Sequence, residues 1–90
     1  MNPLGYQQIT SLGSSTALTV PSDPEKQPAE KAIISPESQS VRWRDDGTAP
    51  TTTVGYLLTA GSELEYDGDL SKLRFIETAA SSKLNICYYG

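Results

Sequence analysis

A chain of 90 residues is long enough for one small domain, and its formal net charge of −4 would repel the phosphates of nucleic acid. Without histidine and with a single cysteine, it lacks a set of soft zinc ligands, the usual activator of a serine or cysteine nucleophile, and an intrachain disulfide. No apolar run is long enough to cross a membrane and no signal-peptide pattern opens the chain, so we expect a soluble protein made in a reducing cytoplasm.

The pattern in the first third of the chain predicts two strands, a flexible N-terminal arm and an exposed loop. Residues 1–5 are short and polar, and we expect them to form a flexible N-terminal arm. Strands are predicted at 6–10 and 16–20, with a turn between them. Residues 21–30 contain three prolines and almost nothing apolar. Because proline fixes φ and lacks an N–H, this segment is predicted to be an exposed loop within the domain that spans 6–90.

The centre of the chain carries the clearest strand pattern, Val-Arg-Trp-Arg followed by Asp-Asp-Gly. Val41 and Trp43 alternate with Arg42 and Arg44, so the apolar pair and the arginine pair lie on opposite faces of a strand. One buried indole removes ~150 to 250 Å² from water, and we therefore expect the only tryptophan to dominate a small core. Asp-Gly is a strong turn signal and ends this strand at Gly47.

The residues before this pattern predict its partner. Residues 31–35 form a short apolar run that Pro36 is expected to end. Only a short link separates this run from Val41, so the two strands are predicted to pair as an antiparallel hairpin.

Four further strands are predicted in the second half of the chain, at 54–58, 63–66, 73–78 and 83–89. Any helix is expected to be at most one turn, near 70–73. Alternation along these strands, together with the central one, predicts a core made of Val41, Trp43, Leu64, Tyr66, Phe75, Leu84 and Ile86. About eight short strands separated by turn signals indicate an all-β fold, a small antiparallel β-sandwich or a jelly-roll-like barrel.

Acidic side chains are the remaining candidates for a metal site. Aspartates and glutamates occur as close pairs that could offer oxygen ligands to calcium: Asp45 and Asp46, Glu63 and Glu65, Asp67 and Asp69. The aspartates stand where turns need Asp beside Gly, and the glutamates would face Arg42 and Arg44 if their strands were neighbours. Solvated turns and surface ion pairs are therefore the favoured interpretation, with no metal, no cofactor and no catalytic site.

Tyrosines raise a second possibility, a glycan-binding module. Such a module needs exposed aromatic rings with polar neighbours, and Tyr56, Tyr66, Tyr88 and Tyr89 are the candidates. Three of them lie on faces predicted to point inward, which leaves Tyr89 as the outward-facing one. The sequence favours core tyrosines and keeps sugar binding as an alternative.

Several stretches resemble small proteins encoded among the virion genes of tailed bacteriophages. The resemblance covers about residues 17–89 and is strongest at 41–51, 57–61, 67–77 and 83–89. The proline-bearing segment 21–30 departs from the glycine- and alanine-bearing link expected there. The resemblance implies a virion structural protein without enzymatic activity: a capsid decoration (cement) protein that binds and stabilises the assembled head, or a neck or tail accessory protein.

On this interpretation the partner is the major capsid protein, or neck and tail proteins of the virion, and we expect self-association into a homo-oligomer. The protein would be made in the bacterial host cytoplasm and reside in the virion, without contacts to nucleic acid or membrane. The binding surface is predicted to include the N-terminal arm and the residues Arg42, Arg44, Thr48, Pro50, Thr51 and Tyr89.

Overall fold

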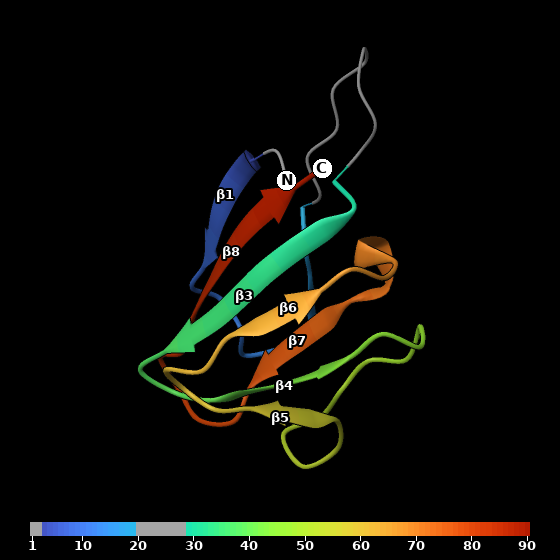
Figure 1. The fold of residues 1–90 in the computed structure, drawn as a ribbon. Coiled ribbons are helices and arrows are strands. Elements are labelled where there is room, and N and C mark those ends of the chain that lie inside the picture. The colour runs from blue at the N-terminus through green and yellow to red at the C-terminus, as the bar shows by residue number, and fades with distance from the viewer. Residues whose placement is uncertain (1–2, 20–28) are drawn as a thin grey trace.

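Two four-stranded antiparallel sheets pack face to face in the computed structural model, which describes residues 3–19 and 29–90 (Figure 1). Sheet A contains, in spatial order, β1 (Pro3–Ile9), β8 (Lys83–Tyr89), β3 (Lys31–Glu37) and β6 (Leu64–Tyr66). Sheet B contains β2 (Thr16–Ala17), β7 (Arg74–Glu77), β4 (Val41–Arg44) and β5 (Tyr56–Leu58). One turn of 3₁₀ helix, η1 (Leu70–Lys72), precedes β7. The predicted all-β sandwich of eight strands is confirmed.

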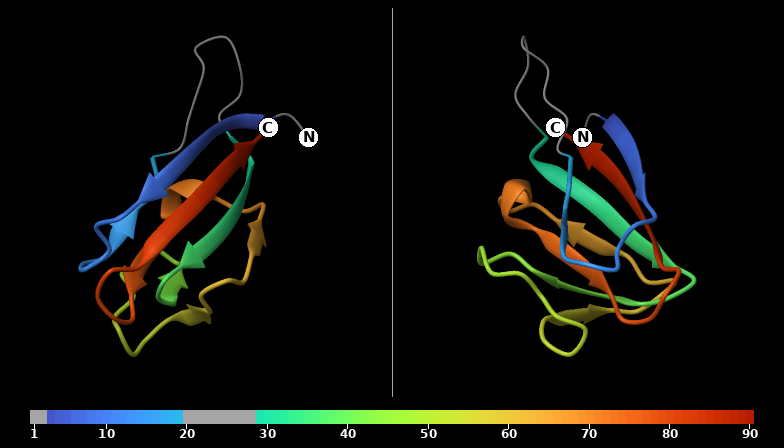
Figure 2. Two further views of the ribbon diagram at one scale, coloured as in Figure 1. Left: turned by 90° about the vertical axis from the view of Figure 1, so that its left-hand side faces the viewer. Right: turned by 180° about the vertical axis from the view of Figure 1, so that it is seen from behind.

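The order of pairing is that of a jelly roll. The first strand pairs with the last, β2 with β7, β3 with β6 and β4 with β5, all antiparallel. The chain is thus one long hairpin folded over on itself, and the pairs β3·β8 and β4·β7 complete the two sheets. The start of β1 and the end of β8 consequently lie side by side, as both views of Figure 2 show.

Side chains that alternate along the strands fill the space between the sheets. The buried apolar residues are Ile9, Leu12, Ala29, Ala32, Ile34, Val41, Leu58, Leu70, Leu73, Phe75, Leu84, Ile86 and Tyr88. Four predicted core residues are among them, whereas Trp43, Leu64 and Tyr66 are only partly buried against this cluster. The prediction that tryptophan dominates the core was wrong, because the largest buried side chains are Tyr88 and Phe75.

The predicted hairpin between residues 31–35 and 41–44 does not form. β3 lies in sheet A and β4 in sheet B, so the link between them carries the chain from one sheet to the other. Ser38 turns the chain with φ of 73°, and neighbouring segments hold the link in place. The Ser82 hydroxyl donates to the Gln39 carbonyl at 2.8 Å, and the Ala60 N–H donates to the Ser40 hydroxyl at 3.0 Å. A short link therefore connected two sheets instead of two paired strands.

Pro36 does not end β3 but lies inside it, buried and opposite Leu84 of β8. Its carbonyl accepts a hydrogen bond from the Gly61 N–H at 2.9 Å, on the side away from β8. The nitrogen of the same residue faces that side too, where β6 pairing has already stopped at Ile34. Proline is tolerated because no ladder hydrogen bond is lost there.

The N-terminal segment differs from its prediction in two ways. β1 begins at Pro3, so residues 3–5 belong to sheet A and not to an arm, while residues 1 and 2 lie outside the described part. Leu12, predicted to stand in a turn, is fully buried, and its carbonyl accepts the Glu77 N–H at 2.9 Å. Of the predicted loop at 21–30, residues 21–28 lie outside the described residues and Ala29 is buried.

Among the residues that the structure describes, no helix has the length and hydropathy that would carry the chain across a bilayer.

Candidate binding surface

Arg42 holds the loop that connects β4 and β5. Its side chain leaves the outer face of β4, and its Nε donates to the Thr52 carbonyl at 3.1 Å while Nη1 donates to the Gly55 carbonyl at 2.9 Å. Within the loop, the Thr51 hydroxyl accepts the Val54 N–H at 2.9 Å and closes a local turn. Arg42 therefore uses two of its N–H donors to bind the loop. This is a structural role for a residue that was predicted to contact a partner.

Gly55 lets the returning loop lie directly against β4. Its φ is +132°, a region that side chains disfavour, and a Cβ atom there would lie 3.2 Å from both Pro50 Cβ and the Trp43 carbonyl oxygen. Pro50 is accordingly buried in this contact, whereas Thr48 and Thr51 remain exposed. The loop is thus packed onto the sheet by a glycine and a proline and is tied to it by Arg42.

At the end of β4, Arg44 and Asp46 form a two-bond ion pair. Nε and Nη2 of Arg44 donate to the two carboxylate oxygens of Asp46, and Asp46 Oδ1 also accepts the Thr48 N–H at 3.2 Å. These hydrogen bonds, from Arg44 first and Thr48 second, lower the pKa of Asp46, and the same pairing raises the pKa of Arg44. The pair fixes a guanidinium and a carboxylate side by side at the surface.

Three aromatic rings line the open edge of the sandwich, on the side of the edge strands β5 and β6. Trp43 lies between Tyr56 of its own sheet, at a centroid distance of 5.1 Å, and Tyr66 of the opposite sheet, at 6.0 Å and edge-on. The Tyr66 hydroxyl donates to Asp45 Oδ2 at 2.8 Å. Burial, and then this carboxylate, raise the pKa of Tyr66 to about 12. Sheet A therefore covers the indole, while Tyr56 remains 67% exposed.

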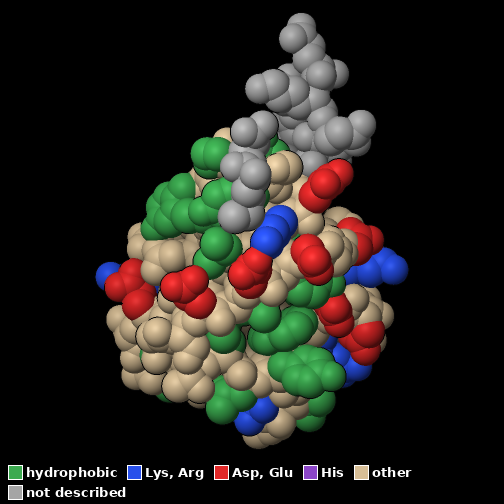
Figure 3. Space-filling model, in the orientation of Figure 1, with side chains coloured by type: hydrophobic (Ala, Val, Ile, Leu, Met, Phe, Trp, Pro, Cys, Tyr) green, Lys and Arg blue, Asp and Glu red, His purple; other side chains and the backbone are tan. Residues whose placement is uncertain are grey.

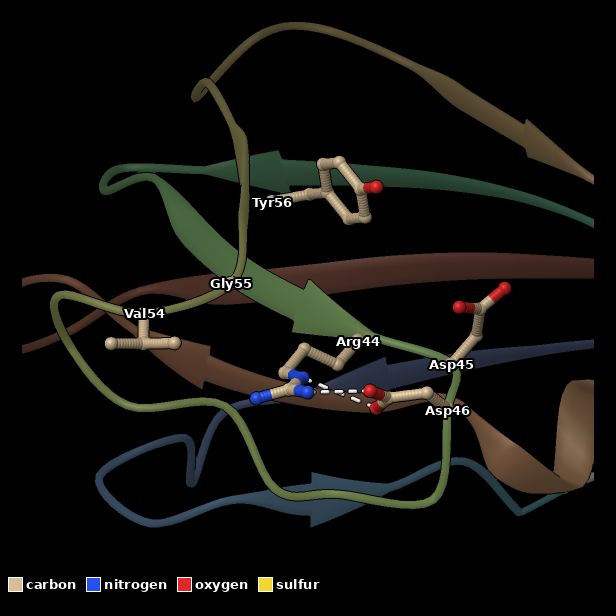
Figure 4. A pocket seen from close by; sticks show the side chains of 6 residues that line it. All are labelled: Arg44, Asp45, Asp46, Val54, Gly55 and Tyr56. Carbon is tan, nitrogen blue, oxygen red and sulfur yellow. Dashed lines mark hydrogen bonds and ion pairs between the residues drawn. The ribbon is translucent and has the colours of Figure 1, made fainter.

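A hollow of about 400 Å³ lies between this aromatic edge and the β4–β5 loop (Figure 4). Figure 4 shows the Asp45 carboxylate and the Tyr56 ring on one side of the β4 ribbon and the Arg44–Asp46 pair on the other. Val54 and Gly55 complete the lining. Across residues 3–19 and 29–90, no three His, Cys, Asp or Glu side chains come together as ligands for a metal ion.

The outer face of sheet B carries all three arginines of the chain. Val41, Phe75 and Leu58 point inward, so the residues that alternate with them point out. We call this surface the arginine face; in β4, β5 and β7 it consists of Arg42, Arg44, Leu57, Arg74 and Ile76. Within it, Arg44 stands directly opposite Arg74, and Arg42 is flanked by Leu57 and Ile76.

Five of the six predicted contact residues come together on β4 and its loop: Arg42, Arg44, Thr48, Pro50 and Thr51. Tyr89 does not join them, because it lies at the end of β8 on the outer face of sheet A, opposite Lys31. The glutamates were expected to face the β4 arginines only if their strands were neighbours, and β6 and β4 belong to different sheets. Glu65 belongs to sheet A and pairs there with Lys31.

Sequence reasoning missed the exposed apolar residues of this region, Val54, Tyr56 and Leu57, which are 51%, 67% and 54% exposed. The sequence pattern predicts that Tyr56 points inward; it shares the side of Trp43 but remains mostly exposed there. The missed signal is the run Tyr-Leu-Leu in β5, since three consecutive apolar residues of a strand cannot all point inward. At least one had to face solvent, and the edge position of β5 exposes two.

No family model, no curated protein and no solved structure matches this chain. Its function is therefore inferred from the surfaces described above and from the resemblance noted in the sequence.

Proposed function

We propose that this protein is a non-enzymatic structural component of a tailed-bacteriophage virion, a capsid decoration protein that binds the assembled head through its arginine face. The major capsid protein is the proposed partner, and the contact on it is a carboxylate-rich surface. The protein would be made in the bacterial host cytoplasm and become part of the virion. A neck or tail accessory protein is the alternative that the same resemblance allows.

The placement of the arginines is the observation that carries this proposal. The chain has eleven acidic and seven basic residues, yet all three guanidinium groups stand on one sheet face. Among the described residues, Arg44 has an ion pair with Asp46, whereas Arg42 and Arg74 have none. Asp46 already compensates the charge of Arg44, whereas Arg74 stands directly opposite it without an ion pair in the described part of the chain. A carboxylate of a partner can bind such a guanidinium with two parallel hydrogen bonds.

Apolar contact area accompanies these charges. Leu57 is 54% exposed and stands beside Arg42, while Ile76 on its other side is half-buried. Arginine is enriched at protein interfaces, lysine and acidic residues are depleted there, and the fully buried centre of an interface is more apolar than the rest of the surface. The arginine face combines arginines with apolar residues in this way, and because it lies on a sheet its backbone is already ordered.

Decoration of a shell would act by mass action. A ligand that binds only the assembled state stabilises that state by about 2.7 kcal/mol per site when its concentration is 100 times the dissociation constant. Repeated over many shell positions, a modest contact stabilises the whole particle. Because shell positions are related by symmetry, we also propose that the protein associates with itself at these positions.

Copy number in purified virions tests the proposal and separates it from its alternative. Mass spectrometry of intact particles should detect this chain in hundreds of copies if it decorates the shell, and in about six or twelve copies if it belongs to the neck. Absence of the chain from purified particles would rule out both.

A charge reversal tests the arginine face itself. Arg74→Glu should weaken binding to heads that lack the protein by at least about tenfold, because it places a carboxylate against the acidic partner. Lys83→Glu is the matched control: it makes the same change in net charge at an exposed position of sheet A. Circular dichroism verifies that both variants fold. Equal binding by the two variants would show that the arginine face is not the contact.

A further inference from the structure

Tyr56 offers a flat, exposed aromatic surface whose orientation is fixed. The ring is tilted by 36° against Trp43, and Trp43 is held in turn by the edge of Tyr66. Hydrogen bonding of Tyr66 to Asp45 keeps that last ring in place. A ligand that stacks on Tyr56 therefore binds a preorganised surface, and the Tyr56 side chain loses little conformational entropy on binding.

Asp45 has unused hydrogen-bonding capacity on the same side of β4 as this ring. Asp45 accepts the Tyr66 hydroxyl through Oδ2, and Oδ1 has no partner among the described residues. Arg44 and Asp46 also line the hollow, but their side chains lie on the other side of β4 and are bound to each other. The polar group that a ligand on Tyr56 can reach is therefore a carboxylate oxygen, which accepts hydrogen bonds. A hydroxyl can donate to this oxygen, whereas a group that only accepts cannot.

The local charge restricts the ligand further. Asp45 and Asp46 line the hollow, and the carboxylates of Asp67 and Asp69 lie close enough to act on Tyr66. In the view of Figure 3, acidic side chains are spread over the middle of the molecule and hydrophobic ones gather below them, toward β4 and β5. An anionic ligand would be repelled from such a surface. The site selects a molecule without negative charge, apolar on one face and rich in hydroxyls at its rim.

We propose that the hollow beside Tyr56 binds one pyranose ring of an uncharged saccharide. The C–H face of the sugar lies on the Tyr56 ring, and one of its hydroxyl groups donates to Asp45 on the same side of β4. The volume of about 400 Å³ falls within the range of small-molecule sites and accommodates a single sugar unit of a longer chain. This inference does not depend on the virion proposal, since it uses the aromatic edge and not the contact made by Arg74.

Trp43 supplies a direct readout, because it is the only tryptophan and touches Tyr56. Immobilised uncharged glycans are first screened on an array, and the hits are titrated as soluble trisaccharides, with maltotriose, cellotriose and trigalacturonic acid included throughout. Indole emission should change saturably in the millimolar range with a neutral sugar and stay unchanged with the anionic one. Saturation-transfer NMR should show the sugar C–H protons in contact with aromatic protons.

Two tyrosine variants localise the site. Tyr56→Ala should weaken binding about tenfold or more, because the stacking surface is lost. Tyr6→Ala is the matched control, since Tyr6 is 62% exposed but stands on β1 in sheet A, and it should bind as the unmodified protein does. NMR is used to compare the variants, because removal of Tyr56 also alters the resting emission of Trp43.

Three results would overturn the proposal: no uncharged glycan binds, Tyr56→Ala binds as well as Tyr6→Ala, or Trp43 emission changes with protein concentration alone. The last result would assign the aromatic edge to contact between copies of the chain. Sugar binding that survives Arg74→Glu, together with loss of head binding in that variant, would show that the two proposed surfaces act separately.

Discussion

Replacing Leu12 by alanine tests a part of the core that lies outside every strand. The Leu12 side chain is fully buried, and its carbonyl accepts the Glu77 N–H that ties the β1–β2 link to sheet B. Alanine keeps this hydrogen bond and removes only side-chain atoms. The variant therefore measures the burial of one leucine in a segment whose sequence predicts a turn.

The expected loss follows from that burial. Leucine-to-alanine changes at fully buried sites cost roughly 2–5 kcal/mol, and we expect about 3 kcal/mol for Leu12→Ala. A 90-residue domain has a free energy of unfolding of about 5–13 kcal/mol, so this single change removes a large share of it. In a domain of this size it lowers Tm by about 12–24 °C. Leu57→Ala, at a residue 54% exposed, should stay within about 0.5 kcal/mol of the unmodified protein.

Urea unfolding followed by far-UV circular dichroism compares the two variants with the parent chain. Leu12→Ala should lower the midpoint with an unchanged slope, because the surface exposed on unfolding is nearly the same. If Leu12→Ala loses no more stability than Leu57→Ala, the β1–β2 link does not contribute to the core and the burial described above is wrong.

Three further predictions concern pH, a glycine and the β4–β5 loop. Burial is the main reason that the pKa values of Tyr66 and Tyr88 are each raised to about 12, so these tyrosines ionise at lower pH in the unfolded chain than in the folded one. The urea midpoint should therefore stay constant up to about pH 9 and fall as the pH rises from about 10 to 12. The fall should be smaller in Tyr66→Phe. Gly55→Ala should lower the stability measured in thermal unfolding by more than about 1 kcal/mol, and by more than Gly61→Ala does. Both glycines have positive φ, but only Gly55 has atoms within 4 Å of the added methyl group. Arg42→Lys should speed cleavage of the loop by thermolysin, since an ammonium group cannot hold two carbonyls in the guanidinium geometry, and an unchanged rate would remove Arg42 from this role.

The candidate surfaces were only partly predictable. Arginines that alternate with Val41 and Trp43 had to share a face, and the turn after Asp46 had to bring the following loop back toward β4. The sequence did not indicate that Arg42 would bind the loop, because that contact depends on the path of residues ten positions away. Tyr89 was predicted for the same surface and lies on the other sheet, since its position depends on which strands pair.

Trp43 and Tyr56 show the limit of alternation as a guide to burial. Both rings belong to the inward-facing set of sheet B, as predicted, yet Tyr56 is mostly exposed. A side chain is buried only where the opposite sheet extends over it, and sheet A ends at β6 beside Trp43. Position within the sheet, which periodicity does not report, decided how much of each ring meets water.

The sequence alone determined the class of fold, because a two-residue period and turn residues act locally. The strands β4 and β8 run over the residues that their patterns predict, and Phe75, Leu84 and Ile86 are buried as expected. Which strands pair with each other was decided only by the tertiary structure. Hydrogen bonds between strands join residues far apart in the chain, so the jelly-roll order, the separation of β3 from β4 and the burial of Leu12 follow from how the two sheets close on each other. The arginine face and the hollow beside Tyr56 exist because that closure leaves one sheet face and one edge uncovered.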